Sequence, residues 1–333
     1  MGVVKVRIIS YTMHVSGDSF HGTQGIIFNK TGRVKDDFYV LGHTWMPSYL
    51  LDGPRPVIFE SGLTCLGKIY EQDIRSVLGN RQPEFLFLSH VHYDHCGATS
   101  YLKNAFPSLQ VAASSKAAQI IKRPTAQRLM KTLSKKAASL ISGVPKDNLL
   151  TEPFKPFTID MLLTDGQVIE MGEGGSVHVL ATPGHTRDLL SYYIPEKRIL
   201  IATEAAGCAD RTGYVVTEFL VDYESYLTGL KRLAALDIEI LCQGHHFVYV
   251  GAAVKEFFAR SLNSAETFRA RVEELLRAEG GSVERVVARI KAEEHDMKPL
   301  PKQPEKAYLL NLRARVSHLA ERMGYIEGHR VKA

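Results

Sequence analysis

The chain has 333 residues, of which 45% are hydrophobic, 23% charged and 9% aromatic. This composition is typical of a folded globular protein with one large domain and an appendage, and it excludes a disordered chain, a collagen and a disulfide-stapled miniprotein. No apolar run approaches the roughly 20 residues of a membrane helix, and the amino terminus does not read as an export signal, so we expect a cytoplasmic protein. The four cysteines form no CxxC pair, which predicts buried, reduced thiols.

The net charge of +5 is unevenly distributed along the chain. Nine lysines and arginines and no acidic residue lie between Tyr101 and Lys146. Pro124 suits the first position of a helix, an apolar stripe follows it, and Gly143 can end the helix. We therefore expect a basic helical insertion at about residues 115–143. Its cations either attract an anionic partner or form a solvated helix face.

Short strands are predicted through the first 250 residues by alternating or wholly apolar runs. Helical spacing is found at Leu66 to Leu78 and after Gly97. Strand-rich halves separated by helices predict two sheets between helical layers. The expected strands are Val3 to Ser10, Gly25 to Asn29, Pro56 to Glu60, Phe85 to Leu88, Gln110 to Ala113, Thr158 to Leu163, Val168 to Met171, Val177 to Ala181, Ser191 to Ile194, Ile199 to Ala202 and Glu239 to Cys242.

The pattern becomes helical after Gly251, with segments expected at Ala252 to Arg277, Val283 to Glu294 and Glu305 to Met323. We therefore divide the chain into a large strand-rich domain at 1–251 and a helical region at 252–333. The apolar face of the last segment must be covered, so these helices are expected to cap a cleft or to form a homodimer contact.

A dense group of metal-binding residue types follows the apolar run Phe85 to Leu88. Imidazoles at positions i and i+2 of a turn can share one metal ion, while a carboxylate at i+4 and an imidazole at i+5 turn toward a second ion. The block that fits this spacing is His90, His92, Asp94 and His95. Further candidates at strand ends are His185, Glu204, and His245 or its neighbour His246.

The block His-x-His-x-Asp-His, the later Pro-Gly-His-Thr, the strand-end acid and the final Gly-His resemble the metallo-β-lactamase-fold hydrolase superfamily over about residues 3–250. The resemblance implies an α/β (α+β) fold, an αββα four-layer sandwich with a carboxyl-terminal helical extension. It implies two divalent metal ions at the edge between the sheets. His90, His92 and His185 would hold the first ion, and Asp94, His95 and His245 the second.

One position departs from the family pattern. Where the family usually has Gly-Asp as the bridging acid, this chain has Thr203-Glu204. Glu204 therefore either bridges both ions, binds one of them, or leaves the second site weak. Nitrogen-rich ligation suits zinc, although iron or manganese also fits the donor set.

The resemblance implies a hydrolase in which a metal-bridging hydroxide is the nucleophile and Asp94 orients it or carries a proton. Flavodiiron oxygen reductases of this fold have a glutamate where His92 stands, which favours hydrolysis over redox chemistry. Helices appended after the metal core resemble glyoxalase II and the quinolone-signal-response thioesterase. We therefore expect a small anionic thioester, such as an acyl-CoA, as the substrate.

Other functions remain open at this point. The same fold serves lactonases, phosphodiesterases and nucleases, and a regulatory binding protein can retain the metal site. Few aromatic residues are interleaved with the basic ones, which argues against nucleic acid as a partner. Four side chains flank loops expected to open on the site, and each either contacts substrate or packs in the core: His21, Trp45, Phe247 and Tyr249.

Overall fold

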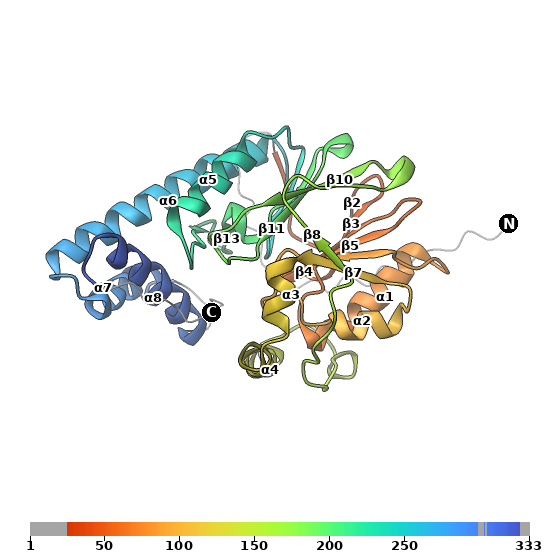
Figure 1. The fold of residues 1–333 in the computed structure, drawn as a ribbon, viewed down its shortest axis with the longest axis horizontal. Coiled ribbons are helices and arrows are strands. Elements are labelled where there is room, and N and C mark those ends of the chain that lie inside the picture. Colours follow the sequence, from red (N-terminus) through yellow and green to blue (C-terminus); the bar gives the residue numbers. More distant parts are fainter. Residues whose placement is uncertain (1–24, 299–302, 304, 327–333) are drawn as a thin grey trace.

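Two seven-stranded sheets pack face to face in the computed structural model, and helices cover their outer faces (Figure 1). The structure describes residues 25–298, 303 and 305–326. The expected strand Val3 to Ser10 and the candidate His21 lie outside the described residues. The arrangement is the predicted αββα sandwich followed by carboxyl-terminal helices.

The amino-terminal sheet has the order β2-β3-β4-β5-β6-β7-β8, and β5 to β8 are parallel. Parallel strands end at the same sheet edge, so residues that follow β5 and β6 come close together. The strands are β2 (Gly32–Lys35), β3 (Phe38–His43), β4 (Met46–Leu51), β5 (Val57–Phe59), β6 (Phe85–Phe87), β7 (Gln110–Ser114) and β8 (Met161–Leu163).

The second sheet has the order β1-β16-β15-β12-β11-β10-β9. Within it β12 and β15 are parallel neighbours, so the residues after each of these two strands meet at one edge. The strands are β1 (Gly25–Phe28), β9 (Val168–Glu170), β10 (Ser176–Ala181), β11 (Leu190–Ile194), β12 (Ile199–Ile201), β15 (Ile240–Cys242) and β16 (Val248–Gly251).

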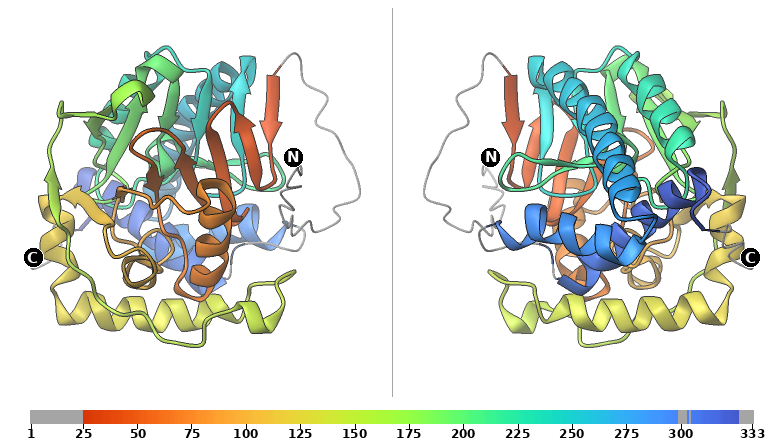
Figure 2. Two further views of the ribbon diagram at one scale, coloured as in Figure 1. Left: turned by 90° about the vertical axis from the view of Figure 1, so that its right-hand side faces the viewer. Right: turned by 90° about the vertical axis from the view of Figure 1, so that its left-hand side faces the viewer.

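Three apolar cores hold the layers together. The central core lies between the sheets and contains Phe59, Phe87 and Tyr192, whose rings contact one another. One outer core joins the amino-terminal sheet to helices α1 (Gly67–Leu78), α2 (Thr99–Ala105) and α3 (Ser115–Ile121). The other joins the second sheet to α5 (Tyr223–Ala234) and α6 (Ala252–Ala278), which lie along its outer face in Figure 2.

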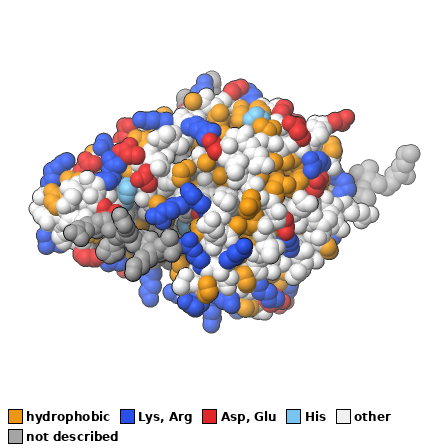
Figure 3. All heavy atoms as spheres, in the orientation of Figure 1, with side chains coloured by type: hydrophobic (Ala, Val, Ile, Leu, Met, Phe, Trp, Pro, Cys, Tyr) orange, Lys and Arg blue, Asp and Glu red, His pale blue; other side chains and the backbone are white. Residues whose placement is uncertain are grey.

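The basic insertion forms two helices instead of one. Helix α3 ends at Ile121, and α4 (Pro124–Ala138) begins at the proline that we placed at a first helical position. Arg123 between them is extended, as expected of a residue that precedes proline. Met130 faces the core, whereas the Lys and Arg side chains of α4 are exposed at the lower edge of the view in Figure 3.

The carboxyl-terminal helices continue from the second sheet. Helix α6 begins directly after β16, and α7 (Val283–Ile290) and α8 (Glu305–Arg322) pack against it around Leu275, Leu312 and Val316. The predicted helix Val283 to Glu294 changes at Ile290 into a π-helical turn, η6 (Lys291–Asp296). Among the described residues no helix has the length and apolar character needed to cross a membrane.

Short elements complete the chain. A small hairpin follows β12 and consists of β13 (Cys208–Ala209) and β14 (Val215–Val216). Single 3₁₀ turns are found at η1 (Thr64–Leu66), η2 (Lys146–Asn148), η3 (Gly172–Gly174), η4 (Pro195–Lys197) and η5 (Thr203–Ala206). The four cysteines are buried and free.

Candidate metal centre

Three histidines from two sheets form the first ligand group. His90 and His92 follow β6, His185 follows β10, and one nitrogen of each lies within 4.8 Å of the others. His185 Nε2 and His92 Nδ1 are 3.2 Å apart. His90 Nε2 is buried without a hydrogen-bond partner.

Two histidines of the first group, His90 and His185, are neutral donors. Burial holds the pKa of His90 well below its ordinary value, and the neighbouring imidazoles of His95 and His92 lower that pKa further. Burial, with His92 beside it, lowers the pKa of His185 to about 3. An uncharged imidazole with an unused buried lone pair is a metal donor, so the residues fit a metal ion at this position.

The second group combines Asp94, His95 and His245 with Glu204. Glu204 Oε1 lies 3.1 Å from His95 Nε2 and 3.1 Å from His245 Nε2, and His245 Nε2 is 3.9 Å from Asp94 Oδ2. Burial alone would raise the pKa of Glu204, but His95 and His245 outweigh burial and hold that pKa well below its ordinary value. The carboxylate is therefore ionised and faces two imidazole nitrogens, a donor set that suits a divalent cation.

Glu204 also reaches the first group, since its carboxylate lies within 4.8 Å of ligand nitrogens of His90 and His95. Its second oxygen, Oε2, is buried without a hydrogen-bond partner. The preceding residue, Thr203, has a φ of +48°, a conformation that glycine adopts readily. Thus the turn after β12 keeps a glycine-like backbone and directs a longer acid between the two groups.

Hydrogen bonds from the outer ring nitrogens orient three of the histidines. His95 Nδ1 donates to Glu60 Oε2 at 2.9 Å, His185 Nδ1 donates to the Glu218 carbonyl at 2.7 Å, and His245 Nδ1 donates to the Trp45 carbonyl at 2.7 Å. Each bond fixes the orientation of the ring, so that Nε2 points into the ligand groups. These partners were not predicted from the sequence.

Glu60 is the supporting residue that the sequence could have revealed. It follows β5, the parallel neighbour of β6, so it lies at the same edge as the histidine block. Its other oxygen, Oε1, accepts a hydrogen bond from the Ser89 amide at 2.7 Å. A similar brace is provided by Asp188, which accepts from the Val91 amide at 3.0 Å and holds the turn between His90 and His92.

The remaining rim candidates have different environments. His245 enters the ligand group, whereas His246 packs edge-on against Trp45 and burial lowers its pKa to about 3. Phe247 is half-buried beside His246. Tyr249 is 2% exposed and stacks on Phe257 of α6. It therefore packs in the core and does not line the site.

A sandwich of two mixed sheets with histidines and carboxylates converging at the ends of strands from both sheets defines a metal-binding protein of the metallo-β-lactamase class. Residues 48–245 match the model of the metallo-beta-lactamase superfamily, and the chain belongs to that superfamily. Its fold is similar to that of a metallo-beta-lactamase family protein from Thermus thermophilus, with a TM-score of 0.59 and 18% identity, covering 87% of this chain and 94% of that one.

Two curated relatives match a shorter part of the chain. The chain is 37% identical over 129 residues to a hydroxyacylglutathione hydrolase from Rhodopseudomonas palustris, covering 36% of this chain and 46% of that protein. It is 29% identical over 120 residues to glyoxylase B2 from Dictyostelium discoideum, covering 36% of this chain and 35% of that protein. The matches therefore span less than half of the length of either relative.

Proposed function

We propose that this member of the superfamily is a metal-dependent hydrolase of a small anionic thioester. The observation that carries the proposal is the convergence of two ligand groups, His90 with His92 and His185, and Asp94 with His95 and His245, on either side of one buried carboxylate. The relatives named hydroxyacylglutathione hydrolase and glyoxylase B2 support a thioester as the substrate class. Divalent ions bound there would supply Lewis acidity and activate water near neutral pH.

The ligand groups have a buried side and an accessible side. His90, His95 and Glu204 are 4% exposed or less, whereas the Asp94 and His245 side chains are 15% and 23% exposed. Substrate therefore approaches from the side of Asp94 and His245. Asp94 lies on that side and would pass a proton from the attacking water to the leaving thiol.

The basic insertion supports an anionic substrate. The Ser142 carbonyl, which follows α4 in the chain, lies 3.4 Å from His43 Nε2. His43 ends β3 and leads into the turn that contains Trp45, and the Trp45 carbonyl accepts a hydrogen bond from His245. The cations of α4 thus belong to a segment that contacts a loop of the metal centre. A positive field at this place would raise the local concentration of a substrate with phosphate or carboxylate groups.

The test combines metal analysis with a substrate panel. Purified protein is analysed for bound metal and assayed with acyl-CoA thioesters, lactones and phosphodiesters. We expect thioester turnover, loss of that turnover in His92→Ala and Asp94→Ala, and its return when metal is restored after chelation. His178→Ala, a histidine of β10 outside both ligand groups, is the matched control and should retain full activity.

Other outcomes would assign the site differently. Turnover of lactones or phosphodiesters alone would keep the metallohydrolase and reject the thioester. Thioester turnover that persists in His92→Ala would contradict the proposed role of the metal centre. Folded protein that binds metal and hydrolyses no member of the panel would favour a regulatory binding protein.

A further inference from the structure

Helix α8 carries a fully buried arginine. Arg315 is 1% exposed, although arginine is among the residue types least often buried. Its Nη1 donates to the Thr217 carbonyl at 3.0 Å and reaches Thr217 Oγ1 at 3.4 Å. The guanidinium also lies over the Phe268 ring of α6, 4.4 Å from the ring centre. Burying a cation is costly unless it makes specific bonds, so the bonds to Thr217 need an explanation.

Those bonds hold one end of the loop at residues 217–222, and a second residue of α8 holds the other end. His318 lies one helical turn after Arg315 on the same face of α8. Its Nε2 accepts a hydrogen bond from the Tyr223 amide at 2.9 Å, where α5 begins. The loop is thus fixed at both ends by one helix.

The opposite side of the same loop holds the turn that carries His185. The Glu218 carbonyl accepts from His185 Nδ1 at 2.7 Å. The amides of Val221 and Asp222 donate to the Gly184 carbonyl at 2.9 Å and 3.2 Å. The loop therefore lies between α8 and the Gly184-His185 turn, and it has direct bonds to both.

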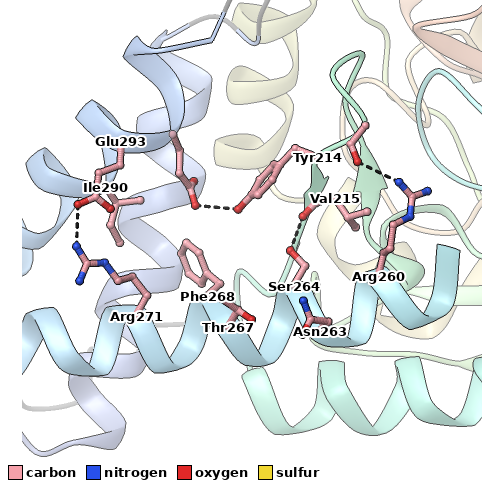
Figure 4. Close-up of a pocket in the computed structure, with 12 residues that line it drawn as sticks. Tyr214, Val215, Arg260, Asn263, Ser264, Thr267, Phe268, Arg271, Ile290 and Glu293 are labelled. Carbon is pink, nitrogen blue, oxygen red and sulfur yellow. Dashed lines mark hydrogen bonds and ion pairs between the residues drawn. The ribbon is translucent and has the colours of Figure 1, made fainter. Parts of the chain in front are cut away.

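The segment that leads into the loop is anchored on the carboxyl-terminal helices as well. Figure 4 shows the hairpin β13–β14 held by α6, where Arg260 donates to the Gly213 carbonyl and Ser264 donates to the Val215 carbonyl. The Tyr214 hydroxyl donates to Glu294 Oε1 of η6 at 2.8 Å. The hairpin that precedes the loop is therefore held by α6 and η6, whereas the loop itself is held by α8.

We propose that Arg315 is a positioning residue for the first metal ligand group, acting through the Thr217-Glu218 backbone to aim His185. The proposal rests on the metal site of the proposed function. On this proposal, residues 305–326 support the metal centre by holding the loop that orients His185, in addition to serving as a cap or contact surface. Losing the guanidinium frees the Glu218 carbonyl to move, and His185 loses the acceptor that fixes its tautomer.

The test measures metal binding to the full chain. Arg315→Met keeps an apolar chain of similar length against Phe268 and removes the donors to Thr217. We expect the affinity for one Co²⁺ ion, followed by its visible absorption, to fall about 10- to 100-fold while the other ion binds as before. In histidine-ring proton–nitrogen spectra of the metal-loaded protein, the His185 Nδ1–H signal should shift or broaden, and the His95 signal should stay.

The controls separate positioning from general loss of stability. Leu312→Ala removes a buried side chain of α8 that makes no bond to the loop, so it weakens the packing of α8 but should leave both Co²⁺ affinities unchanged below its unfolding temperature. Arg315→Lys keeps the charge and one donor nitrogen but loses the guanidinium fork, so it should fold even if Arg315→Met does not, and it should show an intermediate loss of affinity. Unchanged Co²⁺ affinity and an unchanged His185 signal in folded Arg315→Met would overturn the proposal. If Arg315→Met does not fold, the same two results in Arg315→Lys would overturn it. A wild-type chain that binds no metal would instead refute the proposed function.

Discussion

Gly244 and Glu204 form a pair whose fit can be tested directly. A Cβ atom added at Gly244 would lie 2.0 Å from Glu204 Oε1 and 2.7 Å from Glu204 Cδ. Real Cβ contacts below 3.0 Å essentially never occur, so in Gly244→Ala the carboxylate must move by about 1 Å or more. That movement is enough to break the 3.1 Å contacts to His95 and His245.

The expected magnitude follows from the role of that carboxylate. Gly244 does not have the positive φ that makes alanine strained, so the cost falls on the contact with Glu204. We expect metal affinity at the second group to fall about 10- to 100-fold, which is about 1.4 to 2.8 kcal/mol, with a matching loss of kcat/KM. Calorimetric metal titration and steady-state assays measure the two quantities.

A second substitution provides the decisive comparison. Aspartate at position 204 is shorter by one methylene, about 1.5 Å, so Gly244→Ala together with Glu204→Asp has room for both side chains. We expect the double variant to bind metal more tightly than Gly244→Ala alone, although Glu204→Asp alone weakens binding. If the losses of metal affinity in the two single variants simply add in the double variant, the contact between residues 204 and 244 does not determine metal affinity, and this explanation is refuted.

Three further outcomes follow from single residues. Thr203→Gly relieves a β-branched residue at a φ of +48° whose buried Oγ1 has no partner, and should stabilise the metal-free protein by about 1 to 2 kcal/mol in denaturant unfolding. Glu60→Gln leaves one oxygen for two donors, His95 Nδ1 and the Ser89 amide, and should weaken the second metal about 10-fold in a Co²⁺ titration. Burial raises the pKa of Asp73 from 3.8 to about 6, so the folded state holds this proton more tightly than the unfolded state, and stability is lost as pH rises from about 4 to 6. Asp73→Asn should remove that loss, adding up to about 3 kcal/mol at pH 8, and should change nothing at pH 3; an equal gain at both pH values would contradict the assignment.

The sheets and the ligand block could be predicted because their signals are local. Apolar runs of strand length located most strands of both sheets, and the histidine block directly follows one of them. Helix α5 was not predicted from the sequence. It begins at Tyr223, directly after Asp222, whose side chain accepts a hydrogen bond from the Ser225 amide, and much of its buried face is tyrosine and glycine instead of an aliphatic stripe.

The supporting contacts of the site could not be predicted in the same way. The carbonyls of Trp45 and Glu218 accept hydrogen bonds from two of the candidate ligand histidines, and any residue type can supply a backbone carbonyl. Arg315 is recognisable in the sequence, because it lies on the helical face shared by Leu312 and Leu319, where an apolar residue is expected. A charged residue on an apolar stripe indicates a buried polar contact, but only the fold identifies Thr217 as its partner.

The departure from the family pattern at Thr203-Glu204 is compensated within the site. Thr203, in the turn that follows β12, has the left-handed backbone conformation that glycine adopts readily. The longer Glu204 side chain then needs space, and that space exists because Gly244 has no Cβ. Both strands end at one sheet edge, since β12 and β15 are parallel, and this brings position 204 against position 244. The space for the acid at position 204 therefore depends on the glycine at position 244, so Gly244→Ala should weaken metal binding more on its own than together with Glu204→Asp.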